Sequence, residues 1–118
     1  MSWLALVLAV GAAVAPVRIG SKSFAESRIL EEHGQRMIAR DFVPGGKINL
    51  HIKDLNNIVE AAHETGLHLP ISETLLKLMQ AVRDELNGGA YDHSAVLLAL
   101  ENMSDGARVG TAPDKLPK

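Results

Sequence analysis

The sequence contains no cysteine and very few aromatic residues. Without cysteine the chain has neither disulfide bonds nor cysteine-ligated zinc. Hydrophobic residues make up 47% of the chain but aromatic ones only 3%, so Ala, Leu, Val and Ile supply the apolar mass. That composition is typical of packed helices. The 118 residues suit one domain with a modest core.

The chain also lacks an excess of basic residues. Its formal net charge is −2, and the lysines and arginines are scattered along the sequence. Proteins that bind nucleic acid concentrate positive charge on one surface. The sequence therefore predicts no nucleic-acid partner.

The five histidines do not follow a recognised metal-binding motif. No pair matches H-E-x-x-H, and the Glu-x-x-His formed by Glu60 and His63 is a weak signal. We therefore expect no metal site from the spacing.

Residues 3–17 form an apolar run, WLALVLAVGAAVAPV, that allows two interpretations. It resembles the hydrophobic part of a signal peptide, although no positively charged region precedes it. It also fits the end of a buried helix that stops near Gly11 and restarts at Pro16, a favoured first helical position. The run is shorter than the ~20 apolar residues that span a bilayer, so we expect no membrane-spanning segment.

The remaining sequence predicts an all-α fold. A helix capped by Ser23 carries apolar residues as far as Ile38, and a turn over residues 41–46 follows. Three further helices are expected over residues 48–65, 72–86 and 95–103, with Ser72 capping the second of them. Residues 104–118 show no periodicity and predict a frayed, disordered tail. The buried stripes expected for the two longer helices are Ile48, Ile52, Leu55, Ile58, Val59 and Ala62, and Leu75, Leu78, Met79, Val82 and Leu86.

Lys53 and Asp54 place one cation and one anion side by side in the sequence, within an otherwise apolar stretch. One interpretation is a solvated pair on the polar face of an ordinary helix. The other is a lysine directed at an anionic ligand and steadied by its surroundings. Periodicity alone does not decide between them.

Several short motifs follow one another along the chain. They are Phe24-Ala25-x-Ser27, Arg36-Met37, Asp41-Phe42-x-Pro44-Gly45, Leu50-His51-x-Lys53-Asp54-Leu55, Leu69-Pro70 and Asp92-His93-Ser94-Ala95. As a set in this order they resemble the carboxy-terminal domain of the β-hydroxyacid dehydrogenases, a family that includes 3-hydroxyisobutyrate dehydrogenase and 2-hydroxy-3-oxopropionate reductase. The resemblance covers residues 4–103.

The resemblance implies a helical domain like the C-terminal domain of 6-phosphogluconate dehydrogenase, over residues 1–103. Residues 1–15 would then be the end of the interdomain helix rather than a signal peptide. Family members carry a nicotinamide-binding Rossmann domain and a catalytic lysine before this point. The sequence contains no G-x-G-x-x-G loop. The resemblance therefore implies a truncated enzyme with no catalytic residue in this chain.

For the site, the resemblance assigns Lys53 to the cofactor, NAD or NADP, and Asp54 to the substrate side. Gly46 stands where the family often has a phenylalanine against the substrate, which puts the substrate in doubt. Lys22, Asp84 and His93 are expected to be solvated surface or cap residues.

Two functions follow from these expectations. The first is the helical domain of an NAD(P)-dependent hydroxyacid dehydrogenase, inactive alone and partnered by a Rossmann domain. The second is a non-catalytic helical association module, with Leu4–Val14 as its apolar face. A homo-oligomer, a small hydroxyacid substrate and a cytoplasmic location go with the first, while the signal-peptide interpretation would make the chain secreted.

Overall fold

The computed structural model describes the backbone of residues 25–118 and the side chains from residue 31 onward. This part of the chain is all-α, as predicted, and its only β-type pairing is two isolated bridges, Asp41 to Lys115 and Lys47 to Asp92. The predictions made for residues 1–24, including the Ser23 cap, Lys22 and the interdomain helix, lie outside the described residues. The helices are α1 (Ala25–Ala39), α2 (Ile48–Glu64), α3 (Pro70–Glu85), the 3-10 turn η1 (His93–Ala95) and α4 (Val96–Asn102).

The start of α3 differs from the predicted one, whereas α2 starts at the predicted residue. The helix α3 begins at Pro70, not after Ser72, because proline suits the first turn, where an amide hydrogen would have no helical partner. The helix α2 starts without a side-chain cap on Lys47. Instead, the amides of Ile48 and Asn49 donate to the carbonyls of Tyr91 and Gly89, at 2.9 and 3.0 Å.

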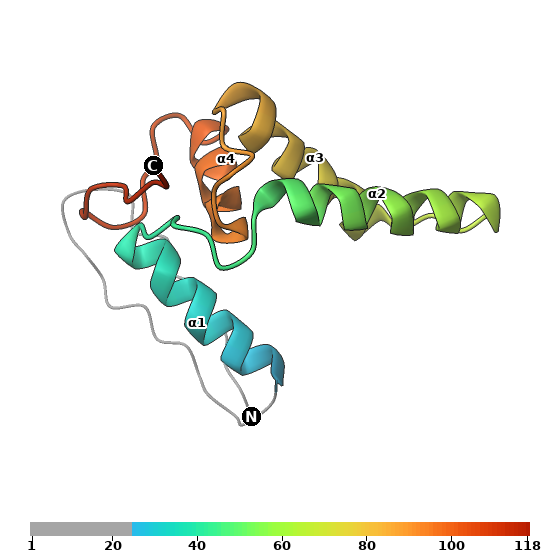
Figure 1. Cartoon of the computed structure of the whole chain (residues 1–118), viewed down its shortest axis with the longest axis horizontal. Coiled ribbons are helices and arrows are strands. Elements are labelled where there is room, and N and C mark those ends of the chain that lie inside the picture. Colours follow the sequence, from blue (N-terminus) through green and yellow to red (C-terminus); the bar gives the residue numbers. More distant parts are fainter. Residues whose placement is uncertain (1–24) are drawn as a thin grey trace.

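The core lies where α2, α3 and α4 meet, and Figure 1 shows α2 and α3 side by side as a hairpin that extends from the rest of the domain. Met79 is buried in this core, as predicted. Ile58, expected in the buried stripe of α2, is instead 52% exposed. The buried apolar cluster consists of Phe42, Ile48, Ile52, Leu76, Met79, Val82, Ala95, Leu97 and Ala99.

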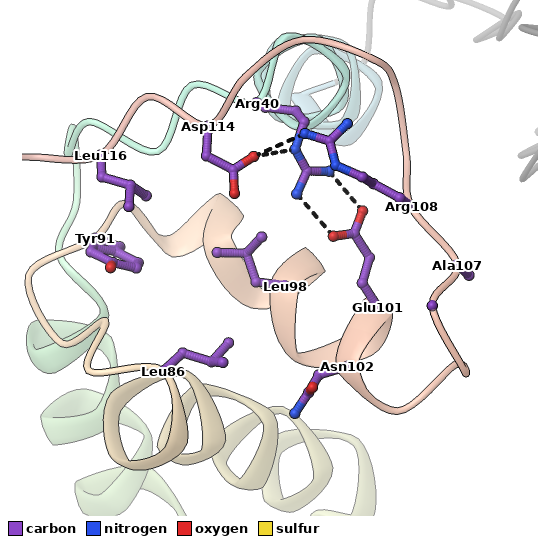
Figure 2. Close-up of a pocket in the computed structure, with 11 residues that line it drawn as sticks. Arg40, Leu86, Tyr91, Leu98, Glu101, Asn102, Ala107, Arg108, Asp114 and Leu116 are labelled. Carbon is purple, nitrogen blue, oxygen red and sulfur yellow. Dashed lines mark hydrogen bonds and ion pairs between the residues drawn. The ribbon is translucent and has the colours of Figure 1, made fainter. Parts of the chain in front are cut away.

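The tail that follows α4 is not frayed in the structure. It forms no helix or strand, but it returns to the end of α1, where the side chain of Arg40 is only 2% exposed. Arg40 donates to both carboxylate oxygens of Glu101, to Asp114 and to the carbonyl of Val109 (Figure 2). Compositional reasoning missed this attachment because buried ion pairs, rather than apolar periodicity, hold the tail.

Arg40 also ends α1. Its φ of +53° lies in the left-handed region, which is unfavourable for a residue with a side chain. The amides of Arg40 and Asp41 donate back to the carbonyls of Met37 and Arg36, as in a common helix-ending motif. The ion pairs of Arg40 offset the strain of this conformation. Among residues 25–118, no helix combines the length and apolarity needed to cross a membrane.

Candidate functional site

The candidate site forms where the loop before α2 lies against the segment before α4. The two segments run antiparallel. The Asp92 amide donates to the Phe42 carbonyl and the His93 amide to the Gly46 carbonyl, at 2.9 and 2.8 Å. Pro44, Gly45 and Gly46 provide the tight turn that this pairing needs. The pairing brings together residues that are more than forty positions apart in the sequence.

The carboxylate of Asp92 holds this junction together. The residue is 0% exposed, and its Oδ1 accepts from the amides of Gly45 and Gly46, at 2.9 and 3.2 Å, and from Arg36 Nη1 at 3.1 Å. Its Oδ2 accepts from the amide and the hydroxyl of Ser94, at 3.0 and 2.6 Å. Both carboxylate oxygens of Asp92 therefore accept more than one hydrogen bond.

These donors determine the charge state of Asp92. Burial alone would raise its pKa, but the hydrogen bonds from Ser94, Gly45 and Gly46 outweigh burial and hold the pKa well below its usual range. Asp92 is therefore ionised at neutral pH and fixes the position of the Gly45–Gly46 turn.

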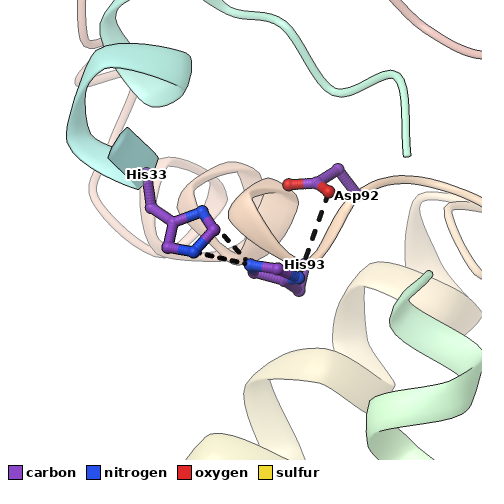
Figure 3. A group of neighbouring side chains, drawn as sticks. All are labelled: His33, Asp92 and His93. Carbon is purple, nitrogen blue, oxygen red and sulfur yellow. Dashed lines mark hydrogen bonds and ion pairs between the residues drawn. The ribbon is translucent and has the colours of Figure 1, made fainter. Parts of the chain in front are cut away.

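Three histidines from three different elements form a hydrogen-bonded chain beside this turn. His51 of α2 places Nε2 3.0 Å from Nδ1 of His93, and His93 Nε2 lies 3.2 Å from a ring nitrogen of His33 in α1. Figure 3 shows His93 between His33 and Asp92. The rings meet edge to face, with centroids 4.3 and 4.7 Å apart. His93 is thus the central member of a polar cluster, whereas the sequence predicted only a surface or cap role for it.

The histidine chain favours a low charge. Burial lowers the pKa of His93, Asp92 opposes this, and His33 and His51 lower it further; the net shift is downward. Two ring-to-ring hydrogen bonds each require one proton between two nitrogens. Three linked imidazoles can therefore carry only one extra proton before a link breaks.

Gly46 is the predicted site residue that the structure brings into this cluster. A Cβ atom at position 46 would lie 2.9 Å from His51 Nε2 and 3.0 Å from His93 Nδ1. The two imidazoles thus occupy the space into which a side chain would point. A ligand at this surface would meet ring nitrogens and main-chain atoms instead of an apolar wall.

The structure places Lys53 and Asp54 on the exposed surface of α2. Asp54 follows His51 by three residues, so both lie on the same side of the helix. Lys53 follows His51 by two residues and therefore points to a different side. Within the part of the chain that the structure describes, Lys53 forms no ion pair. The structure thus joins Gly46 to the histidines but leaves Lys53 apart from them.

A hollow with a volume of about 450 Å³ lies under the returning tail. Its floor is apolar, from Leu86 and Leu98, and Figure 2 shows that its charged groups already face one another. Arg108 and Arg40 both pair with Asp114. Because the charges compensate each other, the hollow offers no group for a charged ligand and is the weaker candidate.

Comparison with known proteins identifies the family. A family described as the NAD-binding domain of NADP-dependent 3-hydroxyisobutyrate dehydrogenase matches residues 4–100 of this chain. The chain belongs to this family. The 3-hydroxyisobutyrate dehydrogenase family match includes all of the loop, the histidines and Asp92.

A curated relative supports the same assignment. The 2-hydroxy-3-oxopropionate reductase of Escherichia coli strain K12 is 46% identical over 105 residues, which cover 86% of this chain. The matched region spans only 35% of the length of that reductase. The chain is therefore similar to about a third of that enzyme, and the resemblance to β-hydroxyacid dehydrogenases expected from the motifs is confirmed.

Sequence reasoning identified the loop and the K-D-L motif but missed the polar cluster. His51 and His93 are part of family motifs and His33 is not, and nothing in the spacing of the three indicates that they touch. The available signal was Asp92, an aspartate that stands before the last predicted helix and within a family motif. Asp92 does cap η1 through the Ser94 amide, while its other oxygen holds the glycine turn.

Proposed function

We propose that this chain is the helical domain of an NAD(P)-dependent hydroxyacid dehydrogenase. The observation that carries the proposal is the fixed Gly45–Gly46 turn, held by a buried carboxylate and lined by imidazoles, within a chain of this family. In the complete enzyme, this surface would face a small hydroxyacid or its semialdehyde. We keep the cytoplasm as the proposed location.

The residues of the chain suit one part of the cofactor, not all of it. Lys53 offers an exposed ammonium that pairs with no other described residue, which suits the charge of a dinucleotide phosphate or a carboxylate. The sequence lacks the glycine-rich loop that holds the pyrophosphate in Rossmann domains. When bound, the nicotinamide supplies the hydride. In this proposal the residues of this chain orient the substrate and neutralise a phosphate or carboxylate charge.

Substrate recognition would fall to the turn and the histidines. Asp54 lies one helical turn beyond His51, on the same side of α2. A neutral imidazole both donates and accepts a hydrogen bond, so this wall suits a hydroxylated, polar substrate better than a branched apolar one. The chain contributes no proton-transfer lysine in this proposal and is inactive alone.

A chimera tests the proposal directly. The matched C-terminal region of the E. coli reductase is replaced by this chain, and NADH- and NADPH-dependent reduction of 2-hydroxy-3-oxopropionate is measured. We expect turnover by the chimera and none by this chain alone. Lys53→Ala in the chimera should raise the KM for the cofactor by about tenfold, because one charged contact is lost. Lys77→Ala, an exposed lysine on α3, serves as the matched control and should leave the KM unchanged.

Two results would contradict the proposal. Turnover by the isolated chain would show that a Rossmann domain is not needed. A folded chimera that binds neither cofactor would show that this chain cannot serve as the partner of such a domain. Calorimetry with NAD and NADP, run on both proteins and on Lys53→Ala, separates failed binding from failed chemistry.

A non-catalytic association module is the second candidate, because the hairpin exposes large apolar side chains. Ile71 is 85% exposed, and Leu50, Ile58 and Leu67 are each more than half exposed. Leu4–Val14, the face expected from the sequence, lies outside the described residues. Sedimentation velocity at micromolar concentration tests the module, because a monodisperse monomer refutes it. Self-association that is lost in Ile71→Ser would place the contact on the hairpin.

A further inference from the structure

The tip of the α2–α3 hairpin gathers three metal-ligating side chains away from the candidate site. His63 lies in the last turn of α2, His68 in the connector and Glu73 in the first turn of α3. His63 Nε2 is 3.0 Å from Glu73 Oε1, and the rings of His63 and His68 have centroids 5.6 Å apart. One ligand atom from each residue lies within 4.8 Å of the other two.

Main-chain hydrogen bonds fix the chain at His63 and Glu73 and on either side of His68. Gly66, at φ +77°, turns the chain out of α2, and the amides of Gly66 and Leu67 donate to the carbonyls of His63 and Ala62, at 3.0 and 2.9 Å. The Glu73 amide then closes the first turn of α3 on the Leu69 carbonyl at 2.9 Å. Only side-chain rotations are therefore needed to bring the ligand atoms together.

Two imidazoles and one carboxylate are the donor set of many three-ligand zinc sites, in which a water fills the fourth position. Ligand atoms about 2.1 Å from a tetrahedral ion lie about 3.4 Å from each other. The His63–Glu73 separation of 3.0 Å is close to that spacing, and exposed side chains can close the remaining gap at little cost. We propose that His63, His68 and Glu73 bind one divalent transition-metal ion of the zinc type.

The other cluster of possible ligands fits an ion less well. His33, Asp92 and His93 also lie within 4.8 Å of one another. Both oxygens of Asp92 already accept several hydrogen bonds, and both ring nitrogens of His93 face another histidine. An ion there would break the contacts that hold the glycine turn. At the hairpin tip it displaces one exposed hydrogen bond, between His63 and Glu73.

The ion would join the end of α2 to the start of α3. Sequence spacing gave only the weak Glu60–His63 signal, which names one of the three ligands, because the ligands come from two helices and their connector rather than from one helix face. Since metal that binds the folded state stabilises it, zinc should raise the thermal unfolding midpoint. That response does not depend on any dehydrogenase activity.

Untagged full-length chain is titrated with Zn²⁺ by calorimetry and with Co²⁺ by visible absorption, which reports coordination geometry. We expect one ion per chain. His68→Ala and Glu73→Gln should each lower the affinity by about tenfold or more, because each removes one of three ligands. Glu85→Gln, an exposed carboxylate at the far end of α3, is the matched control and should bind as the wild type does.

Because His68 is exposed, His68→Ala should keep the helical content of the wild type. Zinc should raise the unfolding midpoint of the wild type and of Glu85→Gln but not that of His68→Ala. No uptake by the wild type, or equal uptake by the wild type and His68→Ala, would overturn the proposal. Equal uptake accompanied by shifts in the His33 and His93 resonances would place the ion at the other cluster.

Discussion

Replacing Asp92 by asparagine is the sharpest test of the candidate site. Asparagine has the shape of aspartate but only one accepting oxygen. If that oxygen takes the place of Oδ1, it still accepts the hydrogen bonds from the amides of Gly45 and Gly46. The new NH₂ group then faces the amide of Ser94. One buried donor then loses its acceptor, and the remaining hydrogen bonds lose their charge.

The expected cost follows from these contacts. An unsatisfied buried donor costs about 1–3 kcal/mol, and the lost charge adds about 1 kcal/mol across the remaining bonds. The bond from Arg36 counts little, because that side chain is partly exposed. We therefore expect Asp92→Asn to lower the free energy of unfolding by about 2–4 kcal/mol. This is less than the usual stability of a small domain, about 5–15 kcal/mol, so the variant should fold.

Urea unfolding followed by circular dichroism at pH 7 measures this loss, and Asp84→Asn is the matched control. Asp84 is exposed and bonded to its neighbour Arg83, so its replacement should leave the urea midpoint unchanged. Because the folded pKa of Asp92 is lowered, its contribution is fully present above about pH 4 and is lost as pH falls further. A change below about 0.5 kcal/mol in Asp92→Asn would refute the role assigned to the carboxylate.

Three further predictions concern the neighbouring contacts. Gly46→Ala should break the hydrogen bond between His51 and His93, because the new Cβ would lie 2.9 and 3.0 Å from their ring nitrogens; the imidazole NMR resonances of His93 should then move at fixed pH, and unchanged resonances would contradict this. Because the folded pKa of His93 is lowered, stability should fall as pH drops below about 6.5, the unfolded value; urea midpoints from pH 8 to 5 should show a weaker fall in His93→Gln than in the wild type. Arg40→Met should leave the carboxylate of Glu101 without its partner and lower the free energy of unfolding by about 3 kcal/mol. Trypsin should then cut the tail faster than in the wild type, and equal rates would show that the ion pairs of Arg40 do not hold the tail.

The sequence predicted the helices best where apolar periodicity and turn residues agree. The helix α2 begins at Ile48, as expected after the turn, and ends within one residue of the predicted Thr65. At α3 the two signals conflicted. Ser72 looked like a cap, but Pro70 begins the helix because its fixed φ already suits a first turn.

The polar junctions could not be predicted, because they join residues distant in the sequence. His51 and His93 are 42 positions apart, and Arg40 meets Glu101 across 61. A hydrogen bond of this kind leaves no periodic trace, and a buried arginine looks like a surface residue until its partners are known. The family resemblance located the loop at Gly46 but gave no account of what fills the space beside it.

The ion pairs of Arg40 with Glu101 and Asp114 also have a consequence for folding during translation. Asp114 follows Arg40 by 74 positions, which a ribosome adding about 5–20 residues per second covers in about 4–15 s. Until Glu101 has been added, 61 positions after Arg40, the guanidinium has neither of its carboxylate partners, and the left-handed end of α1 has nothing to offset its strain. The domain therefore cannot complete its fold during translation of its first two thirds. A nascent chain halted before residue 101 should stay sensitive to protease and become resistant once the tail has emerged.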